Sequence, residues 1–332
     1  MKAGKVGHGH INALQNMRKQ LQSNKTTPAV GARGYFRWKW QEAKRERLMY
    51  LFVLPYVFVF FLFTLLPVII SIILSFTNFN MIRTPEFVGI SNYLKMFLKD
   101  EIFTKALQNT FIFAAVTGPV GYILSFAFAW LINELPQKLR AFMTLIFYGP
   151  SISGNAYLIW AVFFSGDSYG FVNGTLRRMG LISEPIQWFT DANYMIPVLI
   201  VVMLWMSLGT SFLAFRAGLQ GIDKSLFEAA AVDGLRNRWQ ELWYITLPSM
   251  RPQLMFGAVM SITTAFGTGD VITQLSGFPT TDYAAHTLVH HLQDYGTVRF
   301  EMGYASAIAT ILFLMMIACN IVIKKLISKV GE

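Results

Sequence analysis

Glu228-Ala229-Ala230-Ala231-Val232-Asp233-Gly234, followed by Ile245-Thr246-Leu247-Pro248, is a polar, turn-containing stretch between two long apolar runs. This position predicts that the stretch lies in water beside a membrane domain. The small side chains at its centre would let a second surface approach closely. We therefore interpret it as a docking surface for a partner protein, with Glu228 as its charged contact. An amphipathic loop that rests on the membrane is the alternative.

Local signals predict two short helices in this stretch. Asp223 or Ser225 can cap the first helix, and Gly234 can end it because glycine readily takes a positive φ at a helix C-terminus. A second helix is expected through Trp239–Tyr244, with Pro248 as its stop. Residues 223–249 are thus expected to form a helix-turn-helix.

The composition places the chain in a membrane. Hydrophobic residues make up 54% of the 332 residues and charged ones 14%, whereas a soluble domain carries about 25% charge. A helix needs about 20 apolar residues to cross a bilayer, and six stretches are long enough. They are Met49–Phe76, Ala106–Ile132, Ala141–Phe164, Tyr194–Phe215, Leu254–Leu275 and Met302–Ile323. The expected fold is an all-α membrane protein with six transmembrane helices.

The basic residues fall on alternate loops. Of 28 Lys and Arg residues, 21 lie in the N-terminal arm, in the loop after the second span, in the Glu228 stretch or at the C-terminus. Positive charge is retained on the cytoplasmic side, so both termini and the Glu228 stretch are expected there. The predicted organisation is a basic cytoplasmic arm (1–47), a six-span domain (48–325) and a cytoplasmic tail (326–332).

Polar residues inside the predicted spans are candidates for a solute path, because a lipid-facing helix avoids them. The candidates include Ser153, Asn155, Ser207, Thr210, Thr268 and Asp270. Ser and Thr in membrane helices also often bond to backbone carbonyls or pack between helices, and Asp270 can equally cap a helix. Prolines interrupt four of the spans. They indicate either ordinary kinks or a pathway lined by broken helices.

The Glu228 stretch resembles the EAA loop of binding-protein-dependent ABC importer permeases. That loop reads E-A-A, a Gly five residues after the first Ala, and then I-x-L-P. The matching residues are Glu228, Ala229, Ala230, Gly234, Ile245, Leu247 and Pro248, with Asp233 inside the same stretch. Ten residues separate Gly234 from Ile245 where the family usually has nine, which affects the placement of the second helix.

Further segments are similar to the maltose-permease-like branch across most of residues 48–325. Phe87-Val88-Gly89-Ile90-Ser91-Asn92-Tyr93 resembles its F-V-G-x-x-N-Y segment, and Asn109-Thr110 its N-T pair. Phe266-Gly267-Thr268-Gly269-Asp270 resembles a segment that contributes to the sugar site, although Gly269 replaces the usual aromatic residue. Phe266 could supply an aromatic platform for a sugar, and Thr268 a hydroxyl partner.

The resemblance implies the type I importer permease fold and a first-type permease subunit in a bacterial inner membrane. Its implied partners are a second permease, two ATP-binding subunits and an extracytoplasmic solute-binding protein. This chain has no G-x-x-x-x-G-K-[ST] phosphate loop, so ATP and Mg²⁺ are expected on the ATPase subunits and no cofactor in this chain. ATP would drive alternating access of a sugar or oligosaccharide.

Two alternative functions stay open. One is a permease for another solute, such as a glycerophosphodiester, and the other is a self-contained secondary carrier or channel. His286, His290 and His291 cluster in the last outer loop, where His286 and His290 have a spacing that could hold zinc. A contact with the binding protein or a solvated surface is preferred, and neither a metal site nor a catalytic site is expected.

Overall fold

The computed structural model describes residues 47–328. In this range every regular element is helical, and the sole β feature is an isolated antiparallel bridge between Thr77 and Phe87. The all-α prediction is confirmed. The expectations for most of the arm (residues 1–46) and for the end of the tail (329–332) lie outside the described residues.

The chain divides into two compact units, Met1–Val68 and Ile69–Glu332. The described part of the first unit contains α3 (Arg47–Phe60), the π-helical turn η1 (Phe61–Leu65) and the start of α4 (Leu66–Leu74). These three elements run on without a break, and Met49–Leu74 is long and apolar enough to cross a membrane. The first predicted span is therefore confirmed to within two residues at its end.

The second unit holds the other helices in chain order. These are α5 (Ser91–Leu98), α6 (Glu101–Asn133), α7 (Gln137–Ile152), α8 (Leu158–Phe163), α9 (Phe171–Arg178), α10 (Ala192–Met206), α11 (Thr210–Gln220), α12 (Lys224–Val232), α13 (Arg238–Glu241), η2 (Leu242–Thr246), α14 (Leu247–Ser249), α15 (Arg251–Phe266), α16 (Gly269–Ser276), η3 (Thr281–Tyr283), α17 (Leu288–Gln293), η4 (Asp294–Val298) and α18 (Met302–Ile327).

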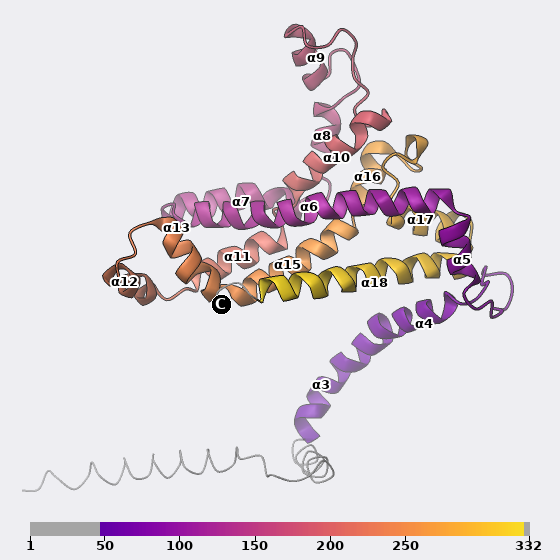
Figure 1. Ribbon diagram of the computed structural model, residues 1–332, viewed down its shortest axis with the longest axis horizontal. Coiled ribbons are helices and arrows are strands. Elements are labelled where there is room, and N and C mark those ends of the chain that lie inside the picture. Colours follow the sequence, from indigo (N-terminus) through magenta and orange to yellow (C-terminus); the bar gives the residue numbers. More distant parts are fainter. Residues whose placement is uncertain (1–46, 329–332) are drawn as a thin grey trace, which may run out of the picture. The chain divides into compact units, whose positions relative to one another are not determined.

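Helices α6, α11, α15 and α18 pack along one another and form the body of this unit (Figure 1). Phe212, Phe215 and Leu254 are buried where α6, α11 and α15 meet. The ring of Phe215 lies so close to Gly257 of α15 that any Cβ there would collide with it. A small residue therefore sets the distance between these two helices, as is usual where membrane helices pack closely.

Five helical segments in the described residues are long and apolar enough to span a membrane. They match five of the six predicted spans. The predicted span Ala141–Phe164 instead consists of α7 and α8, separated by a non-helical stretch between Ile152 and Leu158. Neither helix is long enough alone, so the six-span count stays a prediction. Gly154 takes a φ of +66° in this break, a conformation in which an α-helix cannot continue.

Three pairs of consecutive helices are each separated by a short non-helical break. The breaks lie between α7 and α8, between α10 and α11 at Ser207–Gly209, and between α15 and α16 at Gly267–Thr268. The prolines do not mark them, because Pro119, Pro150 and Pro197 all lie inside continuous helices. Glycine, serine and threonine stand at the breaks instead.

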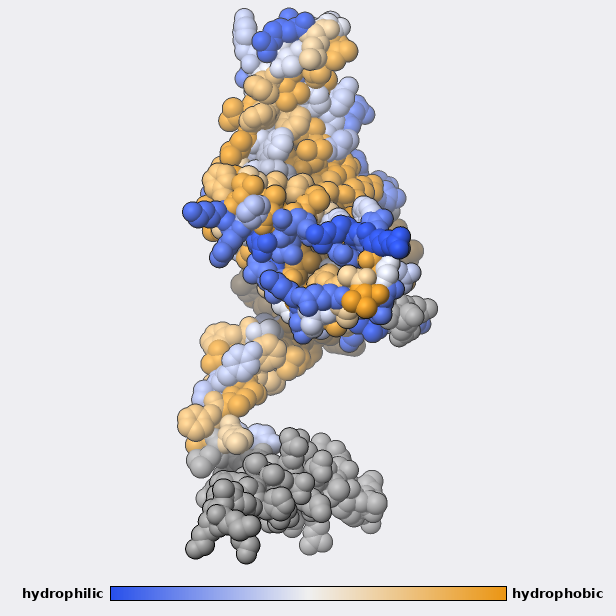
Figure 2. Space-filling view, turned by 90° about the vertical axis from the view of Figure 1, so that its left-hand side faces the viewer, coloured by the Kyte–Doolittle hydropathy of each residue, from blue (hydrophilic) through white to orange (hydrophobic). Residues whose placement is uncertain are grey.

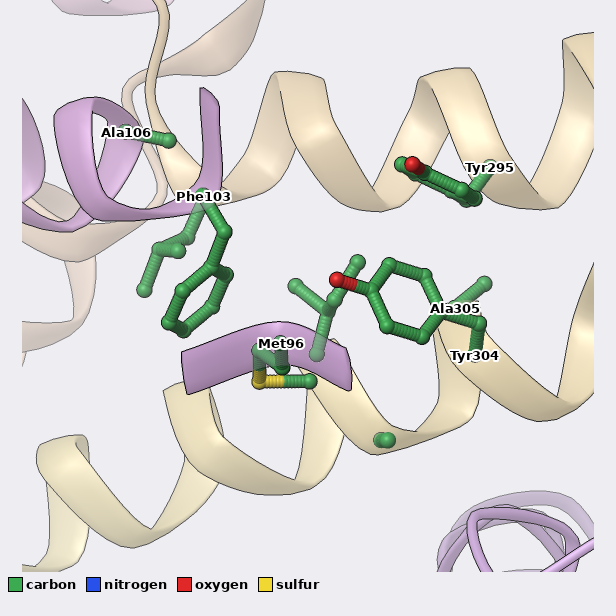
Figure 3. Close-up of a cluster of buried hydrophobic side chains, with 9 residues drawn as sticks. Met96, Phe103, Ala106, Tyr295, Tyr304 and Ala305 are labelled. Carbon is green, nitrogen blue, oxygen red and sulfur yellow. The ribbon is translucent and has the colours of Figure 1, made fainter. Parts of the chain in front are cut away.

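A cluster of buried hydrophobic side chains lies at the end of the unit opposite the Glu228 stretch. Met96, Phe103 and Tyr304 come from α5, α6 and α18, and point into one buried apolar cluster (Figure 3). Asp100, the N-cap of α6, accepts hydrogen bonds from Phe103 N at 2.9 Å and from the Tyr304 hydroxyl at 2.7 Å. It thereby links the start of α6 to α18.

Candidate functional sites: the central cavity and the Glu228 loop

A cavity of about 590 Å³ lies at the three helix breaks, and we call it the central cavity. Its wall includes Asn155 from the first break, Ser207 from the second and Thr268 from the third. A helix break leaves backbone groups without helical partners, and such groups are tolerated at membrane depth where they line a cavity. Broken helices thus do line a cavity, but the prolines from which they were inferred lie inside continuous helices and do not mark the breaks.

Side chains satisfy part of the freed backbone at the second break. The Ser151 hydroxyl of α7 bonds to the Met206 and Leu208 carbonyl oxygens at 3.1 and 3.0 Å. The Ser125 hydroxyl of α6 donates to the Ser207 carbonyl oxygen at 3.1 Å. These bonds fix the ends of α10 and α11 in place, so the cavity wall is held by the neighbouring helices.

Five of the seven predicted path residues line the central cavity: Asn155, Ser207, Thr210, Thr268 and Asp270. Ser153 does not line it and bonds weakly to the Pro150 carbonyl oxygen at 3.4 Å. Phe266 is 3% exposed and lines a separate, apolar cavity instead. Phe266 and Thr268 therefore line different cavities, as expected for residues two apart, which project to different sides of a helix.

Other polar and aromatic residues of the cavity wall were not predicted from the sequence. Tyr148 and Tyr157 supply aromatic rings, and Gln274 supplies an amide. Gln274 lies four residues after Asp270 on α16, which is the spacing of neighbours on one helix face and could have revealed it. Nothing in the sequence distinguishes Tyr148 from a tyrosine facing lipid.

The electrostatics of the central cavity are simple. Asp270 is the one charged residue in its wall, and the other polar groups are hydroxyls and amides. No lysine or arginine of the described residues reaches this wall. The cavity can therefore hydrogen-bond a neutral, hydroxyl-rich solute, whereas it offers no cationic partner to an anionic group.

At the other site, the loop of residues 223–249, the predicted first helix is α12. Asp223 caps it by accepting a hydrogen bond from Ser225 N at 3.0 Å, and this bond lowers the pKa of Asp223. Gly234 ends it with a φ of +93°. Gly234 N bonds to the Ala231 carbonyl and Leu235 N to the Ala230 carbonyl, which together form a Schellman motif. We call residues 223–249 the Glu228 loop.

The second helix of the Glu228 loop is longer than predicted. It starts after Asn237, which caps Trp239 N at 3.0 Å, and continues through α13, η2 and α14 to Ser249. The expectation that Pro248 stops it is wrong. The π-helical turn η2 shifts the hydrogen bonds by one residue, and this relieves the conflict between the proline ring and the preceding turn.

The same π turn accounts for the extra residue between Gly234 and Ile245, where this chain has ten residues and the family usually has nine. A π turn closes over one residue more than an α turn, so an extra residue fits without rotating the helix beyond it. Ile245 and Thr246 accordingly stay buried at 8% and 3% exposure.

Helix α12 has nine residues, and none of them is buried. Glu228, Ala229 and Gly234 are all exposed, and Val232 is 88% exposed. Figure 1 shows α12 at the end of the unit, beyond the ends of the long helices. So short a helix is only marginally stable by itself in water, and an apolar residue on it gains from a partner. The geometry fits a docking helix.

The three histidines of the last long loop are buried, which contradicts the predicted contact or solvated surface. His286, His290 and His291 are at most 1% exposed, because α17 packs against α6 and α18. His291 Nε2 lies 3.0 Å from Asp100 Oδ2, and the His290 ring bonds to Thr287 and Thr273. Within residues 47–328, no three His, Cys, Asp or Glu side chains are placed to hold a metal ion together.

Burial changes the ionisation of this histidine cluster. Desolvation lowers the pKa of His286 to about 3 and that of His290 to about 4. Burial alone would raise the pKa of Asp100, but hydrogen bonds from His291 and Tyr304 outweigh it and hold that pKa below its ordinary value. The two histidines are thus neutral in the folded protein at ordinary pH.

This neutrality predicts a loss of stability in mild acid. Unfolded histidine binds a proton near pH 6.5, while folded His286 and His290 do so at about 3 and 4. Their contribution to the free energy of unfolding is complete above pH 6.5 and is lost as the pH falls. As the pH is lowered from 6.5 to 5, protonation of each histidine in the unfolded chain should reduce the free energy of unfolding by about 2 kcal/mol. Thermal unfolding of the purified chain at pH 7.5 and pH 5 measures this.

A variant isolates the effect. Both ring nitrogens of His286 lack a hydrogen-bond partner, and its ring stacks on Phe278. His286→Phe should therefore keep the stability at pH 7.5 and lose less of it at pH 5. His290→Phe is the comparison, because it also breaks bonds to Thr287 and Thr273 and should be less stable at both pH values. An unchanged acid sensitivity in His286→Phe would contradict the assignment.

Comparison with known proteins agrees with these features. The model of the family "Binding-protein-dependent transport system inner membrane component" matches residues 120–331. The probable ABC transporter permease YesP of Bacillus subtilis is 32% identical over 273 residues, covering 80% of this chain and 86% of that protein. The lactose transport permease LacF of Rhizobium radiobacter is 33% identical over 277 residues, covering 80% and 89%.

The fold also occurs among solved structures. A chain of a bacterial alginate ABC transporter, in complex with a periplasmic protein carrying an alginate pentasaccharide, superposes with a TM-score of 0.71. It is 23% identical, and the match covers 88% of this chain and 98% of that chain. Family match, relatives and fold lead to one conclusion: this chain belongs to the binding-protein-dependent transport system inner membrane component family of ABC importer permeases.

Proposed function

We propose that this chain is the transmembrane permease subunit of an ATP-driven importer that carries a neutral sugar or oligosaccharide. The observation that carries the proposal is α12, a capped helix with no buried residue on a membrane unit that encloses a hydroxyl-lined cavity. An exposed helix needs a partner, and the cavity suits a polyhydroxyl solute. Similarity to a lactose permease supports the solute class.

The complex would contain a second, different permease, two ATP-binding subunits that hold ATP and Mg²⁺, and a solute-binding protein outside. The Glu228 loop faces the cytoplasm in this proposal, because the basic residues gather on its side. Closure of the ATPase subunits would move α12, and the helices would rock from inward- to outward-facing around the central cavity.

The chemistry of the central cavity favours a neutral sugar over a glycerophosphodiester. A phosphodiester carries a negative charge, and in this chain's share of the path it would meet Asp270 and no cation. Hydroxyls and amides such as Asn155 and Gln274 can exchange hydrogen bonds with sugar hydroxyls, while Tyr148 offers a ring face. A neutral sugar is therefore the preferred solute, and the anionic diester is the less favoured alternative.

Reconstitution tests the proposal against a secondary carrier. Liposomes that hold this chain with its second permease, ATPases and binding protein should take up the labelled sugar, provided that MgATP is present on the ATPase side. Liposomes that hold only this chain should show none. Uptake at the full rate by the chain alone would refute the proposal.

Asp270 predicts a charge preference that can be measured directly. Asp270→Asn should strengthen binding of a uronic acid analogue roughly tenfold relative to the parent neutral sugar, because removing a like charge relieves about 1.4 kcal/mol of repulsion. Equilibrium binding of both radiolabelled sugars to the reconstituted complex provides the measurement. Asp191→Asn, at the start of α10 and outside the cavity, is the matched control. An equal change for both sugars would count against a path past Asp270.

A further inference from the structure

A second polar cavity lies beneath the Glu228 loop. It measures about 560 Å³ and is enclosed by the ends of α6 and α11, the start of α7, and elements α12, α13 and η2. Figure 2 views this end of the molecule, where hydrophilic residues gather. Four cations line it, namely Arg140, Arg216, Lys224 and Arg238, against two carboxylates, Glu134 and Glu241. We call it the Arg216 pocket.

One of the four cations, Arg238, forms ion pairs with both carboxylates. Arg238 Nη1 lies 2.9 Å from Glu241 Oε2, and Arg238 Nη2 lies 3.1 Å from Glu134 Oε2. Among the described residues, the other three cations form no ion pair with a carboxylate. The Arg216 pocket therefore holds positive charge without a matching anion.

Arg216 is the most constrained of these cations. It is 6% exposed, and its one recorded hydrogen bond goes from Nη1 to the neutral Asn133 Oδ1 at 3.2 Å. Its Nε is buried with no partner. A buried guanidinium with unused donors and no counter-charge is costly, and an anion in the cavity beside it would relieve that cost.

The remaining cations suit the same ligand. Arg140 donates from Nε and Nη2 to the Leu135 carbonyl oxygen and keeps Nη1 for another acceptor. Lys224 is exposed and has no recorded partner in the described residues; it lies in the first turn of α12, where the helix dipole also favours negative charge. Arginine forks and a lysine point charge together are the groups that bind phosphate.

We propose that the Arg216 pocket binds a phosphate-bearing anion, with Arg216, Arg140 and Lys224 as its charged contacts. Such an anion is either a soluble phosphate ester or the headgroup of an anionic phospholipid, since the pocket lies at an end of the long helices. Lys224 belongs to the Glu228 loop, whereas Arg140 and Arg216 belong to α7 and α11. A bound anion would thus tie the docking helix to the membrane helices.

Binding can be measured without transport, so its outcome is independent of the proposed function. The full-length chain is placed in nanodiscs of phosphatidylcholine and dialysed against radiolabelled inorganic phosphate. A parallel sample in nanodiscs with phosphatidylglycerol is analysed by native mass spectrometry for retained lipid. We expect one saturable site per chain in at least one arm, and the arm that shows it identifies the source.

Variants show whether that site is the Arg216 pocket. Lys224→Gln changes an exposed residue and should fold normally, yet weaken binding roughly tenfold through loss of one charge-assisted contact. Arg216→Gln should weaken it as much or more. Arg177→Gln, an exposed residue of α9 outside the pocket, should leave it unchanged. Absence of saturable binding in both arms, or equal binding by the wild type and Lys224→Gln, would overturn the proposal.

Discussion

Gly234→Val is expected to abolish ATP-driven uptake while the chain still inserts in the membrane. Gly234 closes the Schellman motif of α12 at a φ of +93°, and a Cβ added there would meet no atom within 4 Å beyond its chain neighbours. The cost is therefore purely one of backbone conformation, of order 1–3 kcal/mol for a residue forced into this region. A β-branched residue should unwind the turn and displace α12 from any docking groove. ATP-dependent uptake and co-purification of the ATPase subunits measure the two effects.

Gly180 provides a matched control for this experiment. It also takes a positive φ, +72°, with open space around it, but it lies in the loop that follows α9. Gly180→Val imposes the same kind of strain away from the Glu228 loop, so uptake should persist. Equal loss of uptake in both variants, or normal ATPase co-purification with Gly234→Val, would contradict the docking role.

Thr210→Trp should reduce uptake to background by filling the central cavity. Thr210 is exposed at the first residue of α11, lines the cavity and makes no recorded side-chain hydrogen bond, so the folded protein loses little when it is replaced. An indole at this point would occupy space that the solute needs. Docking is unaffected, and the variant should therefore keep its ATPase subunits and basal hydrolysis.

The control for this variant is Thr104→Trp, an exposed position near the start of α6 that does not line the cavity. It should transport normally. Uptake is measured in liposomes over a range of sugar concentrations, which separates a blocked path from a weakened one. Wild-type kinetics in Thr210→Trp would remove the central cavity from the solute path.

The sequence predicts the Glu228 loop well because the signals are local. Asp223 and Gly234 act within a few residues of themselves, and a helix cap or a positive φ needs no distant partner. The continuation through Pro248 was not predictable in this way. It depends on the π turn at Leu242–Thr246, which propensity rules do not anticipate.

The sequence predicted polar residues of the central cavity, but it did not predict the cavity's geometry. Hydropathy averages over a window, so it merged α7 and α8 into one span and gave no sign of the break before Tyr157. Phe266 and Thr268 were paired because both belong to the segment that resembles the family's sugar site, although residues two apart do not share a helix face. The histidines were misjudged for a different reason: Asp100, which contacts His291, is 191 residues away along the chain.

The way the three interrupted helices meet has a consequence for discrimination between solutes. Peptide groups and freely rotating hydroxyls such as that of Thr210 adapt to many arrangements of sugar hydroxyls. Groups of this kind do not distinguish one epimer or linkage from another by a fixed pattern of contacts. In the proposed importer, stereochemical choice would then fall to the protein that presents the solute. The central cavity would then accept a different solute once the presenting protein is exchanged, without any change in its own residues.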